Sequence, residues 1–223
     1  MRNFYFLLLI IALGLGQASI AKTINFDDID ASLGDVSLDA INSYHGFTWK
    51  NFFAYTSFAG FTGFNNGIVS SPNGAYSGGE ISNGVTTPIV GKIDLGGLFD
   101  LESIFLGGGY YDNLLITVEG RRTGSLIASK VVTVGTGGAV STSFNTFTAI
   151  DELSFYATTT TNTGDPFNCG TFNCTQFTLD NLMLTPAQSG PPTAVPEPSS
   201  LALLSLATAL LGGIRRRVAT HSV

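Results

Sequence analysis

Histidine is nearly absent from this chain. Of the two present, only His45 lies between the terminal apolar runs. A Ser-His-Asp or Cys-His arrangement would have to use it, yet its setting, Ser43-Tyr44-His45-Gly46, is not a nucleophile elbow. Gly107-Gly108-Gly109 is not followed by Lys and Ser or Thr, as a phosphate-binding loop requires. We therefore predict no catalytic residues and a protein that is not an enzyme. A glycosidase with two carboxylates stays an open alternative, because sequence spacing does not show the distance between carboxylates.

Basic residues are also scarce, with ten Lys and Arg against sixteen Asp and Glu. Four of the ten, Arg2 and Arg215 to Arg217, lie in the terminal segments. Residues 22–198 therefore hold six basic and sixteen acidic residues, a net charge of −10. An acidic surface repels phosphate backbones, which excludes nucleic acid as an expected partner. The same balance suits divalent cations.

Cysteine is limited to Cys169 and Cys174, which are separated by four residues. In an exported chain this pair predicts a disulfide that closes a small loop. Metal binding by the pair is the weaker alternative, because two thiolates need further Cys or His ligands and only His45 is at hand.

Both ends of the chain carry apolar runs with basic flanks. Arg2, the run Phe4–Leu15 and the small residues Ser19 and Ala21 predict a signal-peptide helix over residues 1–21, with an uncleaved anchor as the alternative. Near the other end, the run 199–214 is just long enough for a transmembrane helix and is closed by arginines. A buried helix of a globular domain is the alternative there, but the run is apolar all round rather than on one face.

The order of features at the C-terminus resembles the PEP-CTERM sorting signal. Its motif corresponds to Pro196-Glu197-Pro198, its transmembrane helix follows, and its arginine cluster corresponds to Arg215, Arg216 and Arg217. The resemblance covers residues 196–217, with residues 218–223 as a tail and 187–195 as a polar linker. It implies recognition by the membrane protease exosortase in a bacterium that makes extracellular polysaccharide. It also implies transient membrane anchoring, removal of the tail, and a final place at the cell surface or outside the cell.

The body of the chain lacks long runs with helical spacing, apart from a weak candidate over Leu33–Ile41. Short β-rich runs are instead separated by Gly, Asn, Asp and Pro. One continuous strand is expected over Phe47–Tyr55, and Leu114–Glu119 with Ser125–Val134 predicts a hairpin with a five-residue loop. This pattern predicts an all-β, antiparallel two-sheet β-sandwich, a jelly roll, over residues 22–186.

Short segments spread over residues 22–184 resemble the exterior domains of PEP-CTERM proteins, which are similar to jelly-roll carbohydrate-binding and galactose-binding-like domains. Examples are Asn25-Phe26-Asp27-Asp28 and Phe177 to Leu182. The resemblance implies that the first and last strands lie side by side and that carboxylates at their ends hold a structural calcium ion. The candidate ligands are Asp27, Asp28 and Asp180. The alternative is that these aspartates accept hydrogen bonds from local N–H groups.

Carbohydrate binding uses flat aromatic rings together with polar side chains. Tyr110 and Tyr111 are the best surface candidates, because they lie between two strands, and Trp49 is a third candidate that shares a strand face with Phe47 and so also fits the core. The predicted function is non-catalytic binding of the producer's extracellular polysaccharide. A structural or adhesive coat protein without a glycan site is the main alternative.

Overall fold

The computed structural model describes residues 20–77, 89–159 and 175–188. Predictions on the signal peptide, the Cys169–Cys174 pair, residues 189–195 of the linker and everything from 196 onward fall outside these ranges. The described residues up to Ala187 form one compact unit. Within the described ranges, no helix is both long and apolar enough to cross a membrane.

Most described residues belong to one large antiparallel sheet, which confirms the prediction of a β-rich, antiparallel fold. Its main path runs in the order β2-β4-β5-β11-β6-β10-β7-β8, while β1 pairs with β11, and β3 and β9 pair with β6. The strands are β1 (Lys22–Ile24), β2 (Val36–Ser37), β3 (Thr48–Lys50), β4 (Phe52–Tyr55), β5 (Gly74–Ser77), β6 (Gly91–Gly108), β7 (Leu114–Arg122), β8 (Ser125–Val134), β9 (Val140–Ser143), β10 (Ile150–Thr159) and β11 (Phe177–Pro186).

The long strand β6 changes partners along its length. Its first part pairs with β3 and β10, and its second part pairs with β11 and β9. Gly96 lies between these parts with φ of +63°, a conformation that glycine adopts without strain. The carboxylate of Asp94 accepts the Gly96 N–H at 2.9 Å and holds this bend. The bend allows one strand to serve two differently directed parts of the sheet.

The sheet encloses an aromatic core. Phe52 of β4 is fully buried, and its ring contacts Phe155 of β10 at 5.7 Å and Phe177 of β11 at 6.3 Å between centroids. Strands β5, β11 and β6 separate β4 from β10 in the sheet order, so the sheet curls back on itself around this core. Alternation directs the side chains inward: on β7, Leu114, Ile116 and Val118 are buried and their neighbours are half-buried.

Two local predictions near the start of the domain were wrong. The expected strand Phe47–Tyr55 is broken at Asn51, whose φ is +61°. Its backbone N–H donates to Asp39 at 3.0 Å and its side chain donates to the Val90 carbonyl at 2.8 Å, so distant partners hold the break. The weak helix candidate Leu33–Ile41 instead holds strand β2 (Val36–Ser37) followed by the short 3-10 helix η2 (Leu38–Ala40).

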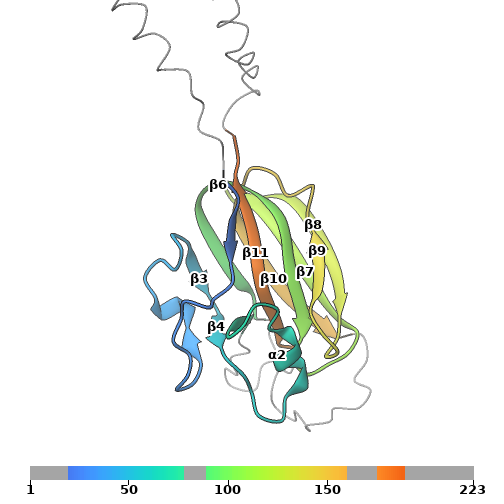
Figure 1. The fold of residues 1–223 in the computed structure, drawn as a ribbon. Helices are drawn as coiled ribbons and strands as arrows, with labels where there is room; N and C mark the ends of the chain where they lie inside the picture. The colour runs from blue at the N-terminus through green and yellow to red at the C-terminus, as the bar shows by residue number, and fades with distance from the viewer. Residues whose placement is uncertain (1–19, 78–88, 160–174, 189–223) are drawn as a thin grey trace, which may run out of the picture. The chain divides into compact units, whose positions relative to one another are not determined.

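The hairpin between β7 and β8 is tighter than expected. Arg122 pairs with Ser125, which leaves a turn of Thr123 and Gly124 in place of a five-residue loop. Both turn residues have positive φ, 47° and 80°, as a two-residue hairpin of the primed type requires. The helix α2 (Thr62–Gly67) was not predicted. Figure 1 shows it at one end of the sheet, away from the C-terminal end of β11.

Candidate functional site

A second group of aromatic residues lies apart from the main core. Three of its rings are buried and four are half-buried, and Ile68 packs against them. We call this group the aromatic cluster; its rings are Phe53, Tyr55, Phe58, Phe61, Phe64, Tyr76 and Tyr110.

Strand pairing and one side-chain clamp assemble the cluster. Phe53 of β4 lies opposite Tyr76 of β5, and their rings stack at 5.4 Å with an interplanar angle of 20°. The Asn65 side chain accepts the Phe58 N–H at 2.9 Å and donates to the Phe58 carbonyl at 3.0 Å. This exposed amide thus fixes the loop that presents Phe58 and Phe61.

Tyr110 joins the cluster from the end of β6. Its ring meets Phe61 at 5.5 Å and Phe64 at 5.1 Å, in both cases edge to face. Close packing of α2 on this end of β6 holds the rings together. A Cβ added at Gly63 would lie 2.9 Å from the Gly109 carbonyl carbon, so no larger residue fits there without a backbone shift.

Polar groups beneath the rings are well satisfied. The Tyr55 hydroxyl donates to the Phe64 carbonyl at 2.6 Å, and the Tyr76 hydroxyl donates to Asp35 at 2.7 Å. Burial, followed by the nearby Asp35 charge, raises the pKa of both Tyr76 and Tyr110 above the ordinary value. Both hydroxyls therefore remain neutral through the ordinary pH range.

The three predicted glycan contacts differ in their exposure to solvent. Tyr110 is half-buried in the aromatic cluster, and Tyr111 follows it, also half-buried. Trp49 is only 3% exposed, and its indole N–H donates to the Tyr44 carbonyl at 3.1 Å. Its ring packs on Phe26 and Phe52 in the main core. We therefore correct the prediction for Trp49, whose ring is not accessible to a surface ligand.

The first and last strands lie side by side, as predicted: β1 pairs with β11, and Ile24 lies opposite Leu182. Asp180 on β11 is fully buried there. Its carboxylate accepts the N–H groups of Val69 at 2.7 Å, Ser70 at 2.8 Å and Asn181 at 2.7 Å, and the Ser70 hydroxyl at 3.1 Å. Burial raises the pKa of Asp180, while these hydrogen bonds act to lower it.

The other two predicted calcium ligands have partners of their own. Asp27 accepts the Asn73 N–H at 3.1 Å and the Asn25 side-chain amide at 2.7 Å. Asp28 accepts the Tyr44 hydroxyl at 2.5 Å and lies 3.4 Å from His45 Nε2. In the part of the chain that the structure describes, no three His, Cys, Asp or Glu side chains gather as ligands of one metal ion. Each of the three aspartates thus has hydrogen-bond partners within the chain.

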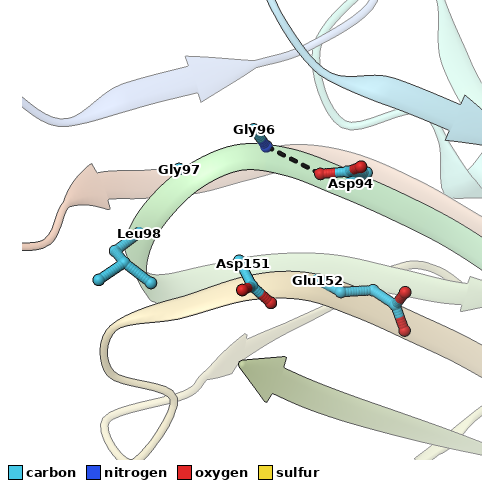
Figure 2. Close-up of a pocket in the computed structure, with 6 residues that line it drawn as sticks. All are labelled: Asp94, Gly96, Gly97, Leu98, Asp151 and Glu152. Atoms are coloured by element: carbon cyan, nitrogen blue, oxygen red, sulfur yellow. Dashed lines mark hydrogen bonds between the residues drawn. The ribbon is translucent and has the colours of Figure 1, made fainter. Parts of the chain in front are cut away.

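A pocket of about 490 Å³ lies at the bend of β6. Phe99 pairs with Ile150, and Asp94 pairs with Glu152. The four residues of β6 between Asp94 and Phe99 therefore have a single counterpart on β10, Asp151. Figure 2 shows Asp94 on the curved part of β6 and Asp151 with Glu152 on the adjacent β10. The remaining lining residues are Gly96, Gly97 and Leu98.

Each carboxylate of this pocket has a partner. Asp94 accepts the Gly96 N–H, Asp151 accepts the Thr123 N–H at 2.8 Å, and Glu152 lies 3.3 Å from the Lys92 ammonium. These interactions stabilise the bend, the hairpin turn and the strand pair. The pocket nevertheless gathers three carboxylates, and a two-carboxylate mechanism could operate there.

Sequence reasoning missed most of the site. It selected Tyr110 but not Phe53, Phe58 or Phe61. The available signal was the density of aromatic residues between residues 51 and 77, a stretch without charged residues.

Comparison with known proteins characterises the end of the chain more than its body. The PEP-CTERM protein-sorting motif matches residues 194–217. The fold is similar to the crystal structure of a DUF4465 family protein from Bacteroides caccae, with 10% sequence identity, a TM-score of 0.43, and coverage of 75% of this chain and 86% of that one. No curated protein matches the sequence. The motif at residues 194–217 implies a protein that is exported, sorted at the membrane through its C-terminus and processed by exosortase.

Proposed function

We propose that this exported chain is a non-catalytic carbohydrate-binding protein of the cell surface or extracellular matrix. Its partner would be the producer's extracellular polysaccharide, and its scaffold would be the two-sheet jelly roll expected from the sequence. The observation that carries the proposal is the aromatic cluster, where Phe53, Phe58, Phe61 and Tyr110 are half-buried above a rigid aromatic base. Partly exposed rings in fixed positions suit the apolar faces of sugar rings.

The polar surroundings of the rings support the same function. Ser57, Thr62, Asn65 and Asn66 are exposed in the loop and helix that carry Phe58, Phe61 and Phe64. Hydroxyl and amide groups can both donate and accept hydrogen bonds, as sugar hydroxyls require. A few polar groups around an apolar surface is the usual composition of a small-molecule or sugar site.

Truncation of the exposed rings is expected to weaken polysaccharide binding at least about tenfold, which corresponds to about 1.4 kcal/mol. The full-length chain, purified in detergent, would be titrated with the producer's purified polysaccharide by affinity electrophoresis. Phe61→Ala and Tyr110→Ala are the test variants. Val131→Ala is the matched control, because Val131 is 57% exposed on β8, outside the cluster.

Equal affinity of the ring variants and the control would contradict this assignment of the site. If the folded wild-type chain binds no polysaccharide, the alternative of a structural or adhesive coat protein without a glycan site is favoured instead.

Catalysis is expected to be absent. The carboxylates of the pocket are already engaged by Gly96, Thr123 and Lys92. The bound polysaccharide should therefore release no new reducing ends during prolonged incubation with the chain. Release of reducing ends that Glu152→Gln abolishes would support the enzyme alternative.

Calcium binding remains a prediction, and the geometry favours the alternative in which the three aspartates accept local N–H and hydroxyl groups. We expect the thermal midpoint to be equal in millimolar calcium and in EGTA. A calcium-dependent rise that Asp28→Asn abolishes would restore the calcium prediction, since exposed Asp28 is the most accessible of the three carboxylates.

A further inference from the structure

The segment that supplies most of the aromatic cluster is uncharged. Residues 51–77 include no Asp, Glu, Lys or Arg, although they carry six of the seven cluster rings. In a chain where residues 22–198 carry sixteen acidic residues, such a stretch leaves the site without charged groups of its own. Recognition there would use rings, hydroxyls and amides.

The cations of the described domain lie on other elements, and several are already engaged. Lys92 is paired with Glu152, Arg121 is 2.7 Å from Glu119, and Lys130 donates to the Ser143 carbonyl at 2.8 Å. The full set of Lys and Arg in the described ranges is Lys22, Lys50, Lys92, Arg121, Arg122 and Lys130. None belongs to β4, α2, β5 or the loop between β4 and α2.

The charge that does reach the cluster is negative. Asp35 is exposed and accepts the hydroxyl of Tyr76, one of the buried rings. An acidic polysaccharide would place its carboxylates or sulfates close to Asp35 and within the field of residues 22–198, whose net charge is −10. At low ionic strength this repulsion extends over tens of ångströms, since the Debye length is about 30 Å at 0.01 M.

We propose that the aromatic cluster binds uncharged polysaccharide and rejects acidic polysaccharide. This inference rests on the proposed function and names the substrate class of the same site. Selectivity arises from repulsion of the acidic polymer, while rings, hydroxyls and amides supply the attraction for the neutral one.

The test compares two fractions of the producer's polysaccharide, separated by anion exchange into uncharged and acidic material. Hydroxyethyl cellulose and carboxymethyl cellulose serve as a second matched pair with one glucan backbone. The full-length chain in detergent is expected to bind the uncharged member of a pair, with an affinity that changes less than twofold between low and physiological salt. Preferential binding of the acidic fraction that weakens as salt increases would overturn the inference, because it would reveal cationic contacts.

Asp35→Asn isolates the local charge and keeps an acceptor for the Tyr76 hydroxyl. At low salt it should raise affinity for acidic polymer severalfold and leave affinity for uncharged polymer unchanged. Glu102→Gln removes the same unit charge from an exposed position on β6, separated from Gly108 by about 20 Å of strand. Equal effects of the two substitutions would overturn a local role for Asp35.

The outcomes separate this inference from the proposed function. Failure of the wild-type chain to bind any fraction would remove both. Binding of acidic polymer that Phe61→Ala abolishes would keep the glycan site and overturn its selectivity. If Phe61→Ala instead changes the molar mass by light scattering and leaves polysaccharide binding intact, a second copy of the chain occupies the cluster and both proposals fail.

Discussion

Replacing Asp180 with alanine is expected to lower the free energy of unfolding by at least about 3 kcal/mol. The side chain is fully buried and accepts hydrogen bonds from Val69, Ser70 and Asn181. Hydrogen bonds to a charged acceptor stabilise more than neutral ones, and buried donors that lose their acceptor are costly. Urea denaturation of the purified variants would measure the change.

A matched control for this substitution is Asp30→Ala. Asp30 also accepts a serine N–H, at 3.2 Å, and the same serine's hydroxyl, at 2.6 Å, but it is exposed. Its replacement should change stability far less, because water can replace the lost acceptor. Similar losses for the two variants would show that burial of the Asp180 hydrogen bonds is not what stabilises the junction of β11 with the loop after α2.

Gly107→Ala is the second substitution with a large expected effect, about 2 to 3 kcal/mol of destabilisation. A Cβ at position 107 would lie 2.5 Å from Thr178 Oγ1, and the next heavy atom is 3.5 Å away. Thr178 is fully buried and its hydroxyl has no hydrogen-bond partner. The steric clash therefore involves one atom, Thr178 Oγ1, which a substitution of Thr178 by alanine removes.

Thr178→Ala should rescue Gly107→Ala, and the double-mutant cycle should show a coupling of at least about 1 kcal/mol. Gly67→Ala provides the contrast: its added Cβ would lie 2.6 Å from Thr178 Cβ, an atom that alanine retains. We expect no comparable rescue there. A Gly107→Ala penalty that is the same with threonine or alanine at position 178 would contradict this packing account.

Sequence periodicity was informative where local packing decides the structure. Leu114 to Glu119 alternates, and the strand and its buried face follow from that alternation. Asn51 could not be anticipated in the same way, because its positive φ is held by Asp39 and Val90, which are distant in sequence. Likewise, the short local runs of the sequence do not indicate that Gly96 and Gly97 form a bend within one continuous strand, β6.

The candidate site was predictable only in part for a related reason. Tyr110 was recognisable as a loop tyrosine between strands, but its contacts with Phe61 and Phe64 bridge more than forty-five residues of chain. Asp180 was selected for its carboxylate, and its actual donors, Val69 and Ser70, come from a loop more than one hundred residues earlier. Sequence supplied the chemical types, while the topology determined which of them meet.

The pairing of β1 with β11 has a mechanical consequence. Lys22 lies opposite Leu184, so the first strand begins beside the point where β11 leads toward the sorting segment. The proposed binding surface is at the other end of β11, where Gly109 donates to the Gln176 carbonyl and Tyr110 follows. Tension between a membrane-held tail and a bound polymer would therefore pull along β11. Its ladders with β1, β5 and β6 would be loaded together in shear, whereas tension between the two chain ends would unzip β1 from β11 one hydrogen bond at a time.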